Sequence, residues 1–146
     1  MTDLSKGFIR LNEMMITPDT TKDDLMRVYG EELNTLMSNA TFLDFNRLFQ
    51  IENHNFMVMF SLNEGGKISS IKLTPYINYK SEKWDRTGRQ EERRQFCDKW
   101  LFDHLGDPIL NNGGALYEFD AVRISCVTHF DIHQGADAGY IAITYR

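Results

Sequence analysis

Cysteine and proline are scarce in this chain, with two cysteines and three prolines among 146 residues. Two cysteines cannot supply the disulfide framework of a small secreted domain or the ligand set of a structural zinc site. Cys97 and Cys126 are widely separated in the sequence, and free thiols in a reducing compartment are the natural interpretation. No apolar run has the length of a signal-peptide core near the N-terminus or of a membrane span elsewhere. The sequence therefore predicts a cytoplasmic protein without membrane contact.

Positive charge is also in deficit, because 16 Lys and Arg face 21 Asp and Glu, for a net charge of −5. Nonspecific binding to phosphate backbones needs an excess of Lys and Arg, so nucleic acid is not the expected partner. What the chain does have is enough apolar residues, 42% of the total, to build a core without disulfides or metals. We expect a single domain over residues 1–146.

The signatures of common enzyme classes are missing from the sequence. The glycine pairs Gly65-Gly66 and Gly113-Gly114 neither open a helix nor carry the lysine of a phosphate-binding loop, so they are interpreted as turns. Cys97 and Cys126 lie in patterns of buried residues and lack the setting of a catalytic nucleophile. Asp and Glu are scattered over caps and loops. These absences predict a non-catalytic protein that uses no cofactor.

An internal repeat organises the rest of the chain. A helical pattern that ends in glycine occurs twice, ending at Gly30 and at Gly106, and strand patterns follow each time. We divide the domain into unit one over residues 8–79, a linker over residues 80–88 and unit two over residues 89–146. Residue types of unit one recur in unit two at a constant spacing, in the pairs Phe60 and Phe130, Leu62 and Ile132, Gly65 and Gly135, Ile71 and Ile141, Leu73 and Ile143, and Thr74 and Thr144.

Local patterns predict two helices and several strands. Thr20 or Thr21 caps a helix that a left-handed Gly30 ends, unless residues 31–37 continue it. A second helix is predicted over residues 89–105, stopped by Gly106-Asp107-Pro108. Because short turns join the strands, the predicted fold class is α+β, with one continuous antiparallel sheet and the helices packed on one face. Period-two alternation places strands over residues 8–15, 47–51, 56–62, 68–75, 115–120, 123–133 and 140–145.

Two tandem units of helix, glycine stop and antiparallel strands, with Leu105-Gly106-Asp107-Pro108 closing a helix before the strands, resemble the fold of the beta-lactamase-inhibitor protein and of the small outer-membrane assembly lipoproteins. The resemblance covers residues 17–145 and is an analogy of fold. The chain departs from both groups, because it has neither a lipid-anchored cysteine near its start nor closely spaced cysteines. In size and acidity it is also similar to the cytoplasmic immunity proteins of bacterial polymorphic toxin systems of the contact-dependent inhibition type.

One group of polar residues has the composition of a metal site. Alternation places His129, Asp131 and His133 on one side of a single strand. Side chains at i and i+4 of a strand lie about 13 Å apart, so His129 and His133 cannot share one ion without a bulge. We therefore interpret these three residues as part of a polar binding surface and expect no bound metal. A metal-dependent enzyme that uses this face remains an alternative.

The linker between the units has a distinctive composition. Residues 80–94 hold six basic and four acidic residues, a net charge of 6 − 4 = +2. Exposed aromatic and Arg side chains are the types that anchor protein interfaces. Tyr76, Tyr79, Trp84 and Arg86 are accordingly our first choice for partner contacts, although Trp84 could instead fold back over the sheet.

These features together predict an immunity protein that neutralises a cognate bacterial toxin by binding and occluding it. A nuclease toxin is basic because it approaches phosphates, and an acidic inhibitor can be steered toward it. An alternative is a small-ligand or envelope-associated protein with a pocket on its concave sheet. Monomer and homodimer are both open, since residues 8–15 or 140–145 could form an exposed sheet edge. The acidic residues that would face a nuclease are Asp19, Asp23, Asp24, Glu31 and Glu32.

Overall fold

The computed structural model describes residues 1–111, 114–127 and 139–146. Within them, eight strands form one sheet in the order β3, β5, β6, β10, β9, β8 and β7, and β4 pairs with β5 off this path. Every pairing is antiparallel, which confirms the predicted α+β class with an antiparallel sheet. The strands are β3 Phe42–Asp44, β4 Phe49–Ile51, β5 His54–Leu62, β6 Ile68–Pro75, β7 Leu110–Asn111, β8 Ala115–Glu118, β9 Val122–Val127 and β10 Tyr140–Tyr145.

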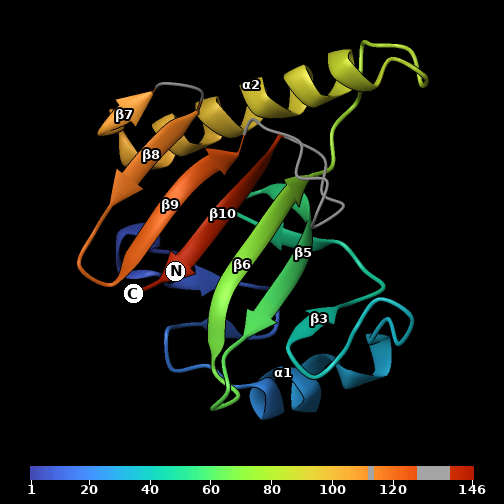
Figure 1. Ribbon diagram of the computed structural model, residues 1–146, viewed down its shortest axis with the longest axis vertical. Helices are drawn as coiled ribbons and strands as arrows, with labels where there is room; N and C mark the ends of the chain where they lie inside the picture. The colour runs from blue at the N-terminus through green and yellow to red at the C-terminus, as the bar shows by residue number, and fades with distance from the viewer. Residues whose placement is uncertain (112–113, 128–138) are drawn as a thin grey trace.

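Both helices pack on the same face of the sheet, α1 over Lys22–Tyr29 and α2 over Arg86–Leu105 (Figure 1). Phe49 and Phe56 are cross-strand neighbours, so their side chains share a face. The ring of Tyr29 from α1 lies 5.1 Å from that of Phe49, and the ring of Trp100 from α2 lies 5.3 Å from that of Phe56. The other described elements are the 3-10 turns η1 Leu4–Lys6 and η2 Gly30–Glu32, and a small separate sheet of β1 Ile9–Arg10 and β2 Met15–Ile16.

The start of α1 follows the sequence signal closely. Thr21 is the N-cap: its hydroxyl accepts a hydrogen bond from the backbone amide of Asp24, and the Asp24 carboxylate accepts one from the amide of Thr21. The expected left-handed end at Gly30 is wrong. Gly30 is right-handed, with φ −57°, and begins η2. The alternative, that residues 31–37 continue the helix, is confirmed only as far as Glu32, by one 3-10 turn.

Helix α2 begins earlier than predicted, at Arg86 in place of Arg89, because Asp85 caps it. The Asp85 side chain accepts a hydrogen bond from the amide of Gly88, and the helix then runs to Leu105. Gly106 has φ +77°, a conformation that favours glycine, and ends the helix where expected. Cys97, Trp100 and Leu101 are buried, which shows the apolar side of α2 turned toward the sheet.

Alternation along β5 defines the core. Phe56, Val58, Phe60 and Leu62 are buried while their neighbours in the strand are exposed or half-buried. The aromatic rings pack edge to face, with Phe45 lying 6.0 Å from Phe60 and 6.2 Å from Phe49 between ring centroids. This cluster joins α1 and the edge of the sheet into the same core as α2.

The centre of the sheet is formed by strands from the two halves of the chain. Strands β6 and β10 are central neighbours, and Lys72 pairs with Ala142, its counterpart at the spacing that relates Ile71 to Ile141. Ile71 and Leu73 on β6 therefore lie opposite Ile143 and Ile141 on β10, on either side of this pair. The outer neighbours of these two strands are β5 and β9. Ile71 on β6 pairs with Phe60 on β5, and Ile141 on β10 pairs with Cys126 on β9. Phe130, the expected counterpart of Phe60, lies outside the described residues.

Two expectations about edges are also wrong. Strand β10 lies between β6 and β9, so residues 140–145 are central in the sheet and offer no edge. Residues 8–15 do not form one strand, since β1 and β2 turn back on each other as a hairpin. The described edges of the large sheet are instead β3 with β4 on one side and β7 on the other. In the described part of the chain, no helix has the length and apolar content needed to span a membrane.

Candidate interaction surface

The face of the sheet opposite the helices is open in the described part of the chain (Figure 1). Its side chains alternate with the core residues, and in β5 and β6 they are Met57, Met59, Ser61, Ser70, Lys72 and Thr74. Met57 is 48% exposed and lies directly opposite Thr74. On the same face, the ammonium of Lys72 lies 4.4 Å from the ring centroid of Tyr140. The surface is therefore mixed, with methionine, hydroxyl and aromatic groups.

At one end of this face the chain leaves β6 and runs to α2 as a loop, which we call the aromatic loop, residues 76–85. Its backbone is fixed from the helix. The carboxylate of Glu92 accepts hydrogen bonds from the amides of Lys80 and Ser81, at 2.6 and 2.9 Å. The guanidinium of Arg89 donates to the carbonyl of Glu82 at 3.0 Å. The first turns of α2 thus hold the loop in one conformation.

The hydrogen bonds at Glu92 also have an electrostatic effect. Those from the side chain of Ser81 and from the amides of Lys80 and Ser81 hold the pKa of Glu92 below its ordinary value of 4.5. The carboxylate is therefore charged at neutral pH, which is the state that accepts all of these bonds.

Two large side chains project from this fixed loop. Trp84 is 82% exposed and Tyr76 is 60% exposed. The amide of Tyr76 donates to the carbonyl of Asn55, so Tyr76 continues the pairing of β6 with β5 beside Met57. The alternative that Trp84 folds back over the sheet is wrong, because a covered indole would be buried. A tryptophan presented to solvent on an ordered loop is the kind of group that anchors a protein interface.

Tyr79 and Arg86 belong to the same predicted contact set, and the structure separates their roles. The hydroxyl of Tyr79 accepts a hydrogen bond from Arg93 at 2.9 Å, and the guanidinium of Arg89 lies 4.3 Å from its ring centroid. Tyr79 therefore holds the loop to α2 and is only half exposed. Arg86 is exposed at the first position of α2, next to the cap Asp85.

The remaining predicted contacts, His129, Asp131 and His133, lie outside the described residues. Among the described residues there is no group of three or more His, Cys, Asp or Glu side chains placed to hold a metal ion. Sequence reasoning missed Met57 and the loop anchors Glu92 and Arg89. The sequence did carry a signal for Met57, because an apolar residue stood at an outward position of an alternating strand. Glu92 and Arg89 hydrogen-bond to backbone groups seven to twelve residues earlier in the chain, and sequence patterns do not reveal such contacts.

The acidic residues that were expected to face a nuclease are mostly engaged with the protein itself. Asp24 is in the cap of α1 and pairs with Arg27 at 2.8 Å. Asp19 pairs with Lys67 at 3.5 Å, and Glu32 with Arg47 at 3.2 Å. Their negative charge is therefore partly neutralised locally, and they do not form a bare acidic patch.

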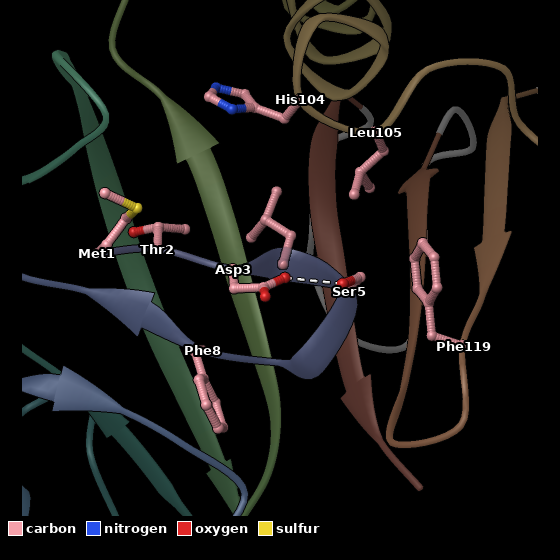
Figure 2. Close-up of a pocket in the computed structure, with 9 residues that line it drawn as sticks. Met1, Thr2, Asp3, Ser5, Phe8, His104, Leu105 and Phe119 are labelled. Atoms are coloured by element: carbon pink, nitrogen blue, oxygen red, sulfur yellow. Dashed lines mark hydrogen bonds between the residues drawn. The ribbon is translucent and has the colours of Figure 1, made fainter.

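A cavity lies on the helix side of the molecule and not on the open face (Figure 2). It has a volume of about 550 Å³ and lies between the N-terminal segment, the end of α2 and the turn after β8. Inside it the hydroxyl of Ser5 donates to the carboxylate of Asp3 at 2.7 Å. The ring of His104 contacts that of Trp100, with centroids 4.2 Å apart and planes tilted by 54°. The lining is Met1, Thr2, Asp3, Leu4, Ser5, Phe8, His104, Leu105 and Phe119.

No protein-family model matches the sequence. No curated protein is detectably similar to it. Among solved structures, the chain is similar to a DUF4309 family protein, YjgB, from Bacillus subtilis subsp. subtilis str. 168. The identity is 16%, the TM-score is 0.48, and the alignment covers 100% of this chain and 87% of that one. At this TM-score the similarity carries no argument about function.

Proposed function

We propose that this chain is a non-catalytic binding protein, and specifically a bacterial immunity protein that neutralises a cognate toxin domain by covering its active surface. The observation that carries the proposal is Trp84, which is 82% exposed on a loop whose backbone is fixed by Glu92 and Arg89. Holding a large apolar group in solvent has no benefit for folding, whereas it lowers the entropy cost of an interface.

The contact surface we propose joins the aromatic loop to the adjoining end of the open face. Trp84, Tyr76 and Met57 supply apolar area, and Arg86 supplies charge at the rim. Three of the five acids near α1 are paired locally, namely Asp19, Asp24 and Glu32. We therefore propose that occlusion by this surface contributes more to binding than steering of a basic toxin by net charge. The proposal includes action in the cytoplasm.

The experiment is coexpression with the C-terminal domain encoded by the gene immediately upstream in the source genome, scored by growth and by copurification. Rescue of growth together with a stable complex is expected. Failure of both would contradict the proposal for that pair.

A matched pair of variants then locates the surface. Trp84→Ala should weaken the complex by about 30-fold or more, as expected for a central tryptophan. Phe102→Ala is the control. Phe102 is also an exposed aromatic residue, with 53% of its surface accessible, but it lies on α2 about 24 Å from the start of the helix, where the aromatic loop ends. Equal affinities of the two variants would contradict the proposed surface while leaving the immunity function intact.

The cavity beside Phe8 and Phe119 favours a second function, binding of a small ligand. Its volume of about 550 Å³ is in the range of small-molecule sites, and its lining combines apolar walls with Asp3, Ser5 and His104. A thermal-shift screen of small metabolites tests this function, and Leu105→Trp, which would fill the cavity, should abolish any shift found. A shift that survives this substitution would place the ligand elsewhere.

A further inference from the structure

Two cysteines that are far apart in the sequence share one interface in the fold. Cys97 lies on α2 and Cys126 on β9, with exposed fractions of 0% and 4%. Both are free thiols. Cys126 pairs across the strands with Ile141, so its side chain points to the core face where α2 packs.

The positions of the two sulfur atoms follow from their hydrogen bonds. The Cys126 Sγ lies 3.7 Å from the carbonyl oxygen of Arg94, one turn before Cys97 on the helix. Side chains of helical residues lean back over the preceding turn, which directs the Cys97 thiol toward the same place. The Cys97 Sγ lies 3.7 Å from the carbonyl of Gly139, at the start of the strand beside β9. The two thiols also contact each other: the Cys126 thiol donates a hydrogen bond to Cys97, and this bond together with burial raises the pKa of Cys126.

A close approach of the backbone brings the helix to the sheet at this point. A Cβ atom at Gly139 would lie 2.6 Å from the Cβ of Arg93 and 2.8 Å from the carbonyl oxygen of Gln90. Only glycine fits, and its φ of +88° is one that other residues rarely adopt. Without a side chain between them, α2 and the β9–β10 pair come near enough for side chains as short as cysteine to meet.

We propose that Cys97 and Cys126 are a disulfide site, oxidised by a small-molecule disulfide such as oxidised glutathione. One cysteine thiolate attacks the glutathione disulfide and releases one reduced glutathione, leaving a mixed disulfide on the protein. The second thiolate then attacks the protein sulfur of that mixed disulfide and releases the second glutathione. The protein loses two protons and two electrons, and the oxidant gains them.

The bond forms before the helix has fully packed. Both thiols are buried, and Cys126, whose pKa is raised, holds little thiolate. Exchange in the folded protein is therefore slow, and the cysteines react while α2 is still docking on the sheet. Once made, the bond ties α2 to β9 and closes the stretch of chain between Cys97 and Cys126 into a loop. It thereby fixes the helix whose first turns carry Arg89 and Glu92. This inference does not rest on the immunity proposal: in a reducing cytoplasm the same site holds two thiols, and the bond forms under oxidising conditions.

The test is refolding of the full chain from denaturant in a glutathione redox buffer, followed by alkylation of free thiols under denaturing conditions and intact mass measurement. A monomer with no alkylated cysteine and a mass about 2 Da below the reduced chain is expected. Closing this loop should raise Tm by on the order of 10 °C relative to the reduced protein, reversibly with dithiothreitol.

The controls are Cys97→Ser, Cys126→Ser and the double variant, whose Tm values should be the same in oxidising and reducing buffers. Wild-type protein that keeps two alkylated cysteines, carries only glutathione adducts, or forms disulfide-linked dimers would overturn the proposal. An internal bond that lowers Tm would overturn it as well, because the bond would then not fit the folded geometry. The thiol count on the wild-type chain decides the matter even if a serine variant does not fold.

Discussion

Replacing Gly88 by alanine tests whether the aromatic loop and α2 are joined as the structure shows. In a helix, alanine is favoured over glycine by about 1 kcal/mol, so this substitution would ordinarily stabilise the protein. Here the amide of Gly88 donates to the Asp85 carboxylate at 2.9 Å. A Cβ atom at position 88 would lie 2.3 Å from the Asp85 Oδ2 and 2.7 Å from the Ser81 Oγ. The capping carboxylate must therefore move away.

The net effect of Gly88→Ala on stability depends on two opposing contributions. Loss of an aspartate N-cap costs about 1 kcal/mol, within a range of roughly 0.5–2. This cost offsets the gain in helix propensity, so the net effect of Gly88→Ala on the free energy of unfolding should lie between about 0.5 kcal/mol of stabilisation and about 1 kcal/mol of destabilisation, centred near zero. In an Asp85→Ala background the cap is already absent, and the same substitution should stabilise by about 1 kcal/mol.

Urea denaturation of the wild type, the two single variants and the double variant measures this difference as a coupling energy of about 1 kcal/mol or more. Additive effects, with Gly88→Ala equally stabilising in both backgrounds, would refute the reasoning. They would show that the carboxylate of Asp85 does not lie over Gly88. Circular dichroism of each variant checks that helix content is retained.

The remaining predictions concern the core, the surface and pH. Phe56→Ala, at a side chain with no exposed area between Phe96 and Trp100, should cost about 3–5 kcal/mol in urea denaturation, whereas Trp84→Ala should change stability by less than about 0.5 kcal/mol. Burial lowers the pKa of His54, so as pH falls the unfolded chain is protonated at this residue before the folded protein is. The free energy of unfolding should therefore decrease as pH drops below 6.5, and His54→Leu should make this part of the stability–pH profile flatter. The pKa of Glu92 is lowered by its bonds to Ser81 and Lys80, so a further loss should begin below pH 4.5 and be shallower in Glu92→Gln. A pH profile unchanged by either substitution would contradict these assignments.

Local chemistry made several elements predictable. Strands over residues 68–75 and 140–145 are observed with those bounds, because alternation and flanking glycines mark them within a short stretch of chain. The cap at Thr21 and the stop at Gly106 depend on one turn of backbone each, and both are observed.

Expectations failed where the answer depended on long-range pairing. The strand over residues 140–145 looked like an edge, and only the pairing of β10 with both β6 and β9 puts it in the centre. The register of β9 is set by its hydrogen bonds with β10, which place Cys126 opposite Ile141. A period-two pattern predicts which residues of a strand share a face, but it does not predict which strand pairs with it or in which register.

For the candidate surface, too, the sequence determined some features and the tertiary structure decided others. Composition by itself singled out Trp84 and Tyr76, because exposed aromatic residues in a charged connection are unusual. It could not distinguish them from Tyr79, whose ring and hydroxyl are taken by Arg89 and Arg93 from the next helix. Tertiary structure also decided that the two cysteines, far apart in the sequence, are neighbours. Residue type and spacing determine local backbone conformation, whereas contacts between distant segments are decided only when the sheet assembles and a helix packs on it.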